Sequence, residues 1–286
     1  TADAEESAWL QQTVAALVAH EGVTLLPRST VFGYYDHNFL AIAERCTDHL
    51  PDPERRGVRQ RLWRVRAKQV VLAQGAFERP LAFCNNDRPG VMLASAVSRY
   101  LGRYAVRPGR RSVVFTNNDS AYPAALDLAQ AGSAVIVVDS RAGGAGWLGE
   151  KVLEAGIPVL AGHIVTNVLG RRRVEGVRVA AWSGDVSRSV ESSIGIECDL
   201  LAMSGGWSPA VHLHSQAGGR NSWDEDLQCF VPAEPAQANT SAGACNGKWS
   251  LRDCLQDGLE AGKTAASRCG LDTANVEVPP LSREVC

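Results

Sequence analysis

The segment from Arg111 to Asp139 constrains the fold of this chain more than any other. An apolar run behind Arg111 leads through a polar loop into a helical pattern, and Gly132 separates that helix from a second apolar run that ends at Asp139. Strand, helix and strand in this order predict a right-handed βαβ unit in a parallel sheet. An acidic residue at the end of the second strand is typical of folds that bind dinucleotides. We therefore expect a Rossmann-like α/β fold with three layers.

Two further apolar runs that end in glycine bracket this unit. One is "VVLAQGA", with Gly75 near its end, and the other is "LLAMSGG", which ends at Gly205 and Gly206. Runs that are apolar on both faces are typical of central parallel strands. The layout predicts one dinucleotide-binding domain inserted into another, with the outer domain at residues 1–80 plus 208–286 and the inserted domain at 81–207. We expect the inner sheet to consist of strands near residues 113, 134, 159, 177 and 200.

Composition and charge argue against nucleic acid and membrane binding. The chain of 286 residues has a formal net charge of -2, so no basic surplus favours nucleic acid. No apolar run approaches the roughly 18 residues that a membrane-spanning helix needs. The N-terminus lacks an initiating Met and a signal pattern and is typical of a helix, which suggests a fragment or a processed chain. We expect a cytoplasmic globular protein.

Cysteines and histidines form no recognisable metal or redox motif. The 8 cysteines include no C-x-x-C pair, which excludes zinc ribbon, thioredoxin-like and haem-attachment patterns and favours reduced, packed thiols. His212 and His214 would share a face on a strand, but no carboxylate or cysteine accompanies them at metal-ligand spacing, so a structural role is favoured. We predict no metal site and no catalytic residue in this chain.

The loop "TNNDSA" stands where a dinucleotide fold normally has its glycine-rich turn. Counting back from the end of the helix puts the three glycine positions at Thr116, Asn118 and Ala121. A side chain at the second position would occupy the space of the phosphates, and Asp119 adds a negative charge beside the helix N-terminus. Asp119 or Ser120 can cap the helix instead. A vestigial inner site is favoured, and the alternative is a different ligand held through its ribose by Asp139.

The outer domain is the better candidate for a cofactor. In folds of this type a strand carrying "STV" lies beside the adenine, so the main chain of Val31 is expected to pair with its edge, although an ordinary buried strand is an equal alternative. Glycines that end a strand or precede a helix let the backbone approach pyrophosphate and ribose. The residues predicted to bind the cofactor in the outer domain are Thr30, Val31, Ala73, Gln74, Gly75, Gly243, Ala244 and Asn246.

Several long phrases of the sequence resemble the α subunits of heterotetrameric sarcosine oxidases. They are "TVFGYYDHN", "RLWRVRAKQVVLAQGAFERPL", "NNDRPGVMLASA", "VVFTNNDSAYPAALDLA", "LLAMSGGWSPAVHLHSQAGG" and "SAGACNGKWSLRDCL", which together cover nearly the whole chain. The resemblance implies a fold like that of the flavoprotein disulfide reductases, with two dinucleotide-binding domains. It also implies NAD in the outer domain, flavin in or shared with partner subunits, and a small amine as the substrate of the complex.

The chain departs from the pattern of these families at its two ends, at two single positions and in its cysteines. It begins after the strand with the full G-x-G-x-x-G, so its outer domain is expected to be incomplete, and it ends before the aminomethyltransferase-like domain that such subunits carry. Gln74 stands where the A-T-G motif usually has threonine. Ala244 stands where the reductases have an acidic residue, which makes a flavin in the outer domain less favourable and is compatible with NAD. The chain also lacks their redox-active cysteine pair, which excludes disulfide reduction.

Three functional hypotheses follow from the sequence. The first is the NAD-binding core of a sarcosine oxidase α subunit, inactive alone, that takes part in flavin-dependent oxidative demethylation of sarcosine within a complex. The second is a component of a related amino-acid, opine or proline dehydrogenase. The third, from a different class, is a non-catalytic assembly scaffold with vestigial nucleotide sites.

Overall fold

The chain divides into two compact units. The computed structural model describes residues 2–54, 57–182 and 193–273. The outer unit consists of Thr1–Ala76 and Ser208–Cys286, and the inserted unit consists of Phe77–Trp207. The chain leaves the outer unit in β5 (Ala76–Glu78) and returns in β14 (Trp207–Pro209), and these two short strands pair with each other. That each unit binds a dinucleotide remains a prediction.

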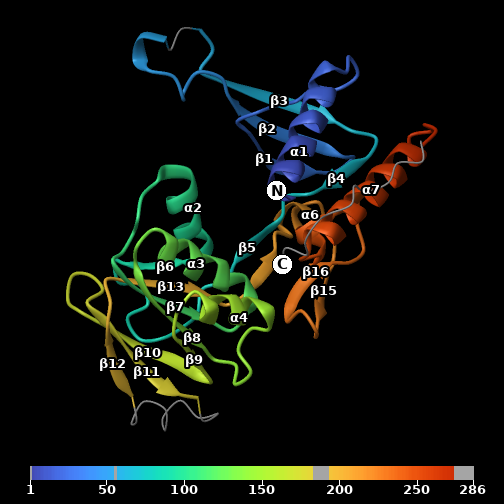
Figure 1. Ribbon diagram of the computed structural model, residues 1–286. Helices are drawn as coiled ribbons and strands as arrows, with labels where there is room; N and C mark the ends of the chain where they lie inside the picture. Colours follow the sequence, from blue (N-terminus) through green and yellow to red (C-terminus); the bar gives the residue numbers. More distant parts are fainter. Residues whose placement is uncertain (1, 55–56, 183–192, 274–286) are drawn as a thin grey trace. The chain divides into compact units, whose positions relative to one another are not determined.

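The inserted unit is built on a parallel sheet (Figure 1). Its five strands lie in the order β6-β13-β7-β8-β9, and every neighbouring pair is parallel. Their bounds are Val91–Leu93 for β6, Leu200–Ser204 for β13, Arg111–Thr116 for β7, Ala134–Asp139 for β8 and Val159–Ala161 for β9. Strands β7 and β8 pair in parallel across an intervening helix, which confirms the βαβ unit predicted from the sequence.

Helices and an antiparallel sheet form the other two layers of the inserted unit. The helical segments are α2 (Ala94–Tyr104), η2 (Asp119–Ala121), α3 (Tyr122–Gln130) and α4 (Trp147–Glu154). The antiparallel sheet contains β10 (His163–Leu169), β11 (Gly176–Ala181) and β12 (Ile194–Glu197). The prediction of an inner-sheet strand near residue 177 is therefore wrong. A tight connection at Gly170 (φ +108°) returns the chain beside β10, so β11 pairs with its sequence neighbour.

The parallel sheet separates two apolar cores because successive side chains of a strand point to opposite faces. On β13, Leu200 and Ala202 join the core beneath the helices, which includes Leu128 and Val152. Leu201 joins the core beneath the antiparallel sheet, which includes Val179. The run "LLAMS" is therefore buried along its whole length, as a central strand requires.

The outer unit combines three small sheets with helices. Strands β1 (Ser29–Tyr35), β2 (Phe39–Arg45) and β3 (Gln60–Arg66) form an antiparallel sheet, β4 (Val70–Leu72) and β17 (Asn239–Ser241) a parallel pair, and β15 (Asn221–Asp224) and β16 (Cys229–Pro232) a hairpin. The helical segments are α1 (Ala2–Ala19), η1 (Asp52–Glu54), α6 (His212–Gln216), η3 (Gly243–Asn246) and α7 (Leu251–Arg268).

Two local features of the C-terminal half concern a helix cap and a pair of histidines. The Oγ atom of Ser250 accepts a hydrogen bond from the Asp253 N–H at 3.1 Å, so Ser250 is the N-cap of α7. His212 and His214 lie in the short helix α6 and not on a strand, so they do not share a face. Residues two apart on a helix point in nearly opposite directions.

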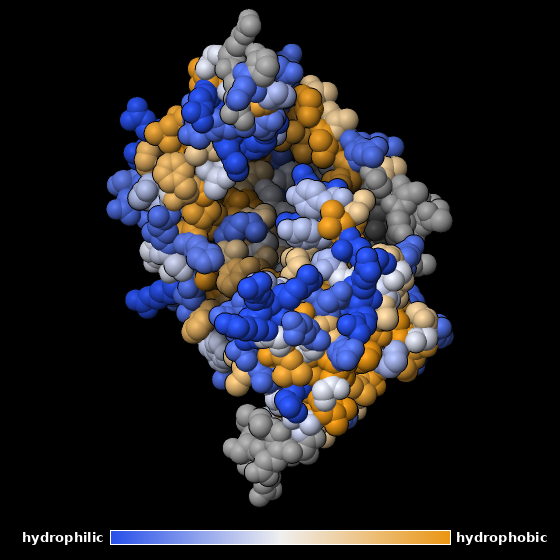
Figure 2. Space-filling model, turned by 90° about the vertical axis from the view of Figure 1, so that its left-hand side faces the viewer, coloured by the Kyte–Doolittle hydropathy of each residue, from blue (hydrophilic) through white to orange (hydrophobic). Residues whose placement is uncertain are grey.

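Apolar side chains remain exposed in both units. Leu10 and Val18 of α1 are exposed, as are Leu153 and Trp182 of the inserted unit, and Figure 2 shows hydrophobic and hydrophilic residues interspersed on the face that it displays. Scattered exposed apolar residues are ordinary in folded proteins, so this face alone identifies no partner. Within the described residues, no helix is long and apolar enough to cross a membrane.

The inserted unit should depend on Leu200. Leu200→Ala removes a fully buried side chain from the core beneath the helices, and we expect the free energy of unfolding to fall by about 2–5 kcal/mol in urea denaturation. The matched control is Leu153→Ala on α4, whose side chain is 59% exposed and which should change stability by about 0.5 kcal/mol or less. Equal effects of the two substitutions would contradict the assignment of this core.

Candidate functional site

The parallel pair of β4 and β17 brings together residues from two distant segments of the outer unit. Leu72 is the register partner of Ser241, and the Leu72 carbonyl accepts a hydrogen bond from the Ala242 N–H at 2.8 Å. Because parallel strands point their carboxyl ends to the same edge of a sheet, the segments that follow them meet there. The structure thus places Ala73, Gln74 and Gly75 beside the turn that contains Gly243, Ala244 and Asn246.

Backbone geometry explains the glycines at this edge. Gly75 and Gly243 have φ angles of +78° and +73°, in the left-handed region that favours glycine. A Cβ atom at Gly75 would meet nothing within 4 Å, whereas one at Gly243 would lie 3.8 Å from Cys254. The chain therefore needs glycine at Gly75 for its conformation, and open space remains on that side of the backbone.

Asp257 on α7 organises the turn at Gly243 and was missed by the sequence reasoning. Its Oδ2 atom accepts from the Gly243 N–H at 2.8 Å and from Nδ2 of Asn246 at 3.0 Å. The carboxylate thus neutralises a backbone donor that would otherwise favour an anion. The amide of Asn246 is engaged within the protein, and Ala244 contributes no polar side chain. The only sequence signal for Asp257 was an acid on the helix that follows a glycine turn.

Cys245 ties the same turn to β4. Its Sγ atom donates to the Leu72 carbonyl at 3.0 Å, and the side chain is fully buried. Burial raises the pKa of the Cys245 thiol, so the sulfur stays protonated and can keep donating. This contact is structural, in agreement with the prediction of packed, reduced thiols for this residue.

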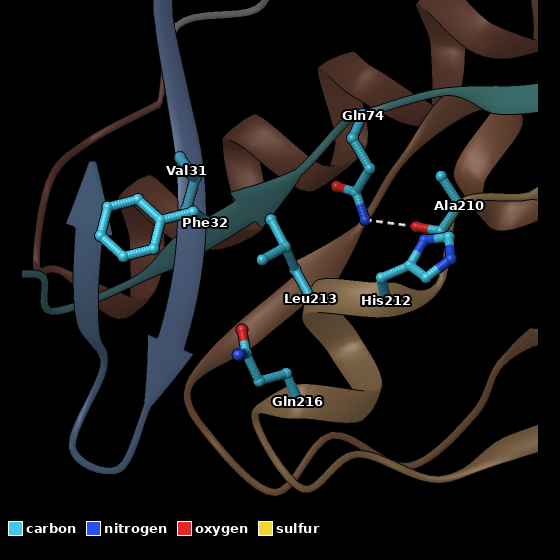
Figure 3. Close-up of a pocket in the computed structure, with 7 residues that line it drawn as sticks. All are labelled: Val31, Phe32, Gln74, Ala210, His212, Leu213 and Gln216. Atoms are coloured by element: carbon cyan, nitrogen blue, oxygen red, sulfur yellow. Dashed lines mark hydrogen bonds between the residues drawn. The ribbon is translucent and has the colours of Figure 1, made fainter. Parts of the chain in front are cut away.

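A pocket of about 490 Å³ opens at this end of the outer unit (Figure 3). We call it the larger pocket. It is lined by side chains from β1, from the segment behind β4 and from α6, namely Val31, Phe32, Gln74, Ala210, His212, Leu213 and Gln216. Two predicted cofactor residues, Val31 and Gln74, are among them. Thr30 lies next to Val31 on β1 but does not line the pocket.

The free edge of β1 faces α6. Hydrogen-bonded and non-hydrogen-bonded residue pairs alternate along an antiparallel ladder. The Arg28 carbonyl accepts from the Arg45 N–H, so these two residues form a hydrogen-bonded pair. Val31 and Ile42, three pairs farther along, then form a non-hydrogen-bonded pair, and the Val31 N–H and C=O point away from β2. Farther along the same edge the Tyr34 N–H donates to Oε1 of Gln216 at 2.9 Å.

The two glutamines of the larger pocket are partly committed to the protein. Gln74 donates through Nε2 to the Ala210 carbonyl, a contact drawn in Figure 3. Gln216 uses its Oε1 atom for Tyr34, which leaves its Nε2 group as a donor. Apolar side chains from Val31 and Leu213 lie on the same pocket. The arrangement suits a flat, largely apolar ring with hydrogen-bonding groups on its rim.

The loop behind β7 in the inserted unit is closed by its own side chains. Asn118, and not Asp119 or Ser120 as expected, is the cap: its Oδ1 atom accepts from the Ser120 N–H at 3.1 Å. The Thr116 hydroxyl donates to the Asn118 carbonyl at 2.8 Å. Nδ2 of Asn118 donates to the Ser204 carbonyl at 3.1 Å. These contacts fill the space where a glycine loop would cradle phosphate.

Asp139 is fully buried and already has its hydrogen-bond partners. It accepts from the Tyr122 hydroxyl at 2.8 Å and from the N–H, Nε and Nη2 groups of Arg141 at 2.8, 3.1 and 2.8 Å. Arg141 also forms a 2.7 Å ion pair with Asp119. Burial first, and then Asp139, raise the pKa of Tyr122, so the phenol stays neutral. A ribose at Asp139 would have to displace these donors.

Gly144, Gly146 and Gly149 spell G-x-G-x-x-G, a pattern that the sequence reasoning missed. The pattern runs into α4, but residues 140–143 separate it from the end of β8. It follows the second strand of the βαβ unit and not the first. A dinucleotide fingerprint requires a strand, a tight turn and a helix in immediate succession, so we assign no phosphate site to it.

The remaining candidates are the cysteines and the two histidines of α6. No cluster of three or more metal-ligating side chains occurs in the described ranges. None of the seven cysteines of the described chain is in a disulfide bond, and Cys286 lies outside it. His212 belongs to the larger pocket, and His214 faces a different cavity.

The sequence is similar to part of the sarcosine oxidase α subunits, as predicted. It is 42% identical over 269 residues to the sarcosine oxidase subunit alpha of Corynebacterium sp. (strain P-1), covering 94% of this chain and 28% of that protein. It is 34% identical over 264 residues to that of Rhizobium meliloti (strain 1021), covering 92% and 25%. The chain therefore spans about a quarter of the length of these relatives. No family model matches the sequence.

Solved structures support the fold class. L-proline dehydrogenase from P. horikoshii superimposes with a TM-score of 0.61 at 20% identity, covering 92% of this chain and 46% of that protein. Bacillithiol disulfide reductase from Staphylococcus aureus gives 0.60 at 15% identity, covering 88% and 73%. At these identities the likeness concerns the fold alone. The predicted Rossmann-like, disulfide-reductase-like α/β fold is confirmed.

Gly75 should be intolerant of a side chain. Gly75→Ala forces a left-handed φ on alanine, and we expect the free energy of unfolding in urea to fall by about 1–2 kcal/mol. Gly143→Ala is the matched control, because a Cβ atom there also meets nothing within 4 Å and the φ of Gly143 is not positive. An unchanged stability of Gly75→Ala would contradict the left-handed conformation.

Tyr122 should make stability depend on pH in the alkaline range. Its pKa is raised in the folded protein, so its contribution is complete below the ordinary tyrosine pKa of about 10 and is lost as pH rises above it. We expect the unfolding free energy to fall less steeply between pH 9 and 11 in Tyr122→Phe than in the wild type, by up to about 1.4 kcal/mol per pH unit. Burial also raises the pKa of Tyr34, so part of the pH dependence of stability should remain in the Tyr122→Phe variant.

The matched control for this experiment is Tyr104→Phe, which changes a tyrosine that is 58% exposed. Its pH dependence should coincide with that of the wild type. Identical slopes in the Tyr122→Phe variant and the wild type would show that the phenol is not held neutral by burial and Asp139.

Proposed function

We propose that this chain is the dinucleotide-binding part of a sarcosine oxidase α subunit and that its outer unit binds NAD in the larger pocket. The observation that carries the proposal is the joint presence of Val31 and Gln74 in one pocket. Both were singled out from the sequence, and they lie on segments that are far apart in the chain. The relatives named sarcosine oxidase subunit alpha match this region.

The proposed adenine position is the free edge of β1. The Val31 N–H and C=O offer one donor and one acceptor side by side, which complement the acceptor N1 and the donor N6 of adenine. The side chains of Leu213 and Phe32 supply apolar surface for the ring. A volume of about 490 Å³ lies within the range of about 300–1,000 Å³ that is usual for ligand pockets.

The strand ends are the proposed contacts for ribose and phosphate. The open space at Gly75 lets the ligand approach the backbone closely. The Gly243 N–H already donates to the carboxylate of Asp257, so it is not available to a phosphate. We therefore propose that this turn faces the ribose and not the pyrophosphate. Ala244 offers no acid to a ribityl chain, which supports a nicotinamide dinucleotide over a flavin at this position.

In the complex, the proposed reaction is the flavin-dependent oxidative demethylation of sarcosine. A flavin held in or shared with partner subunits supplies the redox chemistry when it is bound. The residues of this chain bind and orient a nucleotide, and the proposal gives none of them a chemical step. We propose that the inserted unit binds no nucleotide. The Asn118 side chain lies where a phosphate would bind, and Tyr122 and Arg141 already donate hydrogen bonds to Asp139.

A second candidate is a component of a related amino-acid dehydrogenase. The likeness of the fold to L-proline dehydrogenase from P. horikoshii, over 92% of this chain, favours it. The identity to the sarcosine oxidase subunits is about twice as high, which makes the first candidate the better supported one. A non-catalytic scaffold is the remaining alternative.

Binding of nucleotides to the purified 286-residue chain tests the proposal. We expect NAD to bind in isothermal titration calorimetry and to raise the melting temperature. Val31→Pro removes the N–H that points away from β2 and should weaken binding about tenfold, the loss expected for one hydrogen bond. Val31→Ala keeps the N–H and is the matched control.

The outcomes separate the hypotheses. Binding of FAD in place of NAD would overturn the cofactor assignment but leave the dinucleotide site. Absence of binding by both nucleotides, with no small molecule released on denaturation in mass spectrometry, would support the scaffold. Equal binding by Val31→Pro and Val31→Ala would reject the adenine position.

A further inference from the structure

A second cavity of about 230 Å³ lies in the outer unit, and we call it the smaller pocket. Strand β17, the end of β16 and the segment behind it, α6, η3 and the last turn of α7 all contribute to it. The residues that matter for its chemistry are His214, Asn239, Ser241, Asn246 and Arg268. None of them lines the larger pocket. Helix α6 contributes to both pockets, with His212, Leu213 and Gln216 on one and His214 on the other.

Buried polar atoms of the smaller pocket have no partner among the described residues. Asn239 is 2% exposed, and its Oδ1 atom makes no hydrogen bond within the described chain. The Tyr34 hydroxyl donates to Asn38, and its oxygen is the neighbour of the Asn239 amide group. Oγ of Ser241 is also unpartnered. Leaving such groups unsatisfied is costly, and two of them around one cavity indicate a missing partner.

His214 presents its second ring nitrogen without a partner. The ring is 1% exposed, and its Nε2 atom lies 2.9 Å from the Arg220 carbonyl. A carbonyl only accepts, so Nε2 carries a hydrogen, and Nδ1 is the ring nitrogen that can accept. Nδ1 is buried and makes no hydrogen bond within the described chain. The close approach of Gly219 fixes the ring, because a Cβ atom there would overlap it.

The charge of the pocket favours an anion. Arg268 is its permanently charged residue, and none of the described lining residues is acidic. Asp257, the carboxylate next to this region, is committed to the Gly243 N–H and to Asn246. Guanidinium groups recognise carboxylates through parallel hydrogen bonds. A cation would find no compensating charge here.

We infer that the smaller pocket binds a small carboxylate that carries a hydroxyl or amino group, of the size of an α-hydroxy or α-amino acid. Arg268 holds the carboxylate. The Ser241 hydroxyl donates to one of its oxygens, and Oδ1 of Asn239 and Nδ1 of His214 accept from the hydroxyl or amino group. Pro232 closes the apolar side of the cavity. The inference does not rest on the nucleotide proposed for the larger pocket.

Titration of the 286-residue chain with glycolate and with glycine, followed through the histidine Cε1–H resonances in NMR spectra, tests this inference. The resonance of His214, assigned by its loss in His214→Gln, should shift saturably with a Kd of about 1 mM for one of the two ligands. Ethylene glycol has the hydroxyl group but no carboxylate and should cause no saturable shift. The two ligands distinguish an α-hydroxy from an α-amino acid.

Arg268→Gln is the decisive variant because Arg268 is exposed and its replacement leaves the core intact. We expect it to weaken binding about tenfold or more. Arg252→Gln, which changes an exposed arginine at the other end of α7, should bind as the wild type does. Asn239→Leu should abolish binding.

Two results would overturn the inference. A His214 resonance that does not shift up to tens of millimolar of either ligand would mean that the cavity holds ordered water only. Equal affinities of the wild type and Arg268→Gln would mean that the carboxylate is not recognised by the guanidinium group.

Discussion

The in-register pairing of β4 with β17 is the constraint on which the outer unit depends. Val70 to Leu72 and Asn239 to Ser241 lie next to each other although an entire folded unit separates them in the chain. The pairing closes this loop and aligns the turn behind each strand. Gly75, Gly243 and the wall of the larger pocket are positioned by it. The thiol of Cys245 reinforces the junction from the buried side.

The two units treat their strand ends in opposite ways. In the outer unit, glycine conformations and an unpaired strand edge leave main-chain groups available. In the inserted unit, side chains bond to the groups that a nucleotide would need: Asn118 caps the helix, and Arg141 links Asp119 to Asp139. A single arginine between two carboxylates leaves a residual negative charge at the place where a phosphate would dock. The parallel sheet persists because its cores, and not its loop, hold it together.

The features that sequence analysis could predict are those with local causes. Apolar runs, the helix between them and the glycines at strand ends follow from burial and backbone conformation within a few residues. Asp257 and Arg141 were missed because their importance arises from partners that only the fold brings near. The strand at 177 was placed in the wrong sheet because its apolar pattern fits either sheet, and only the connection at Gly170 decides. The roles assigned to the outer-domain residues stay predictions.

Helix α6 is a thin partition between two cavities. It consists of five residues, and Gln216 ties it to β1 while His214 ties it to Arg220. A ligand that shifts this helix from one side changes the shape of the cavity on the other side. Thermodynamic linkage then requires the effect to be mutual. The factor by which a ligand in the first cavity changes affinity in the second equals the factor by which a ligand in the second changes affinity in the first. The short helix would be the shared wall through which the binding of two chemically different ligands is coupled.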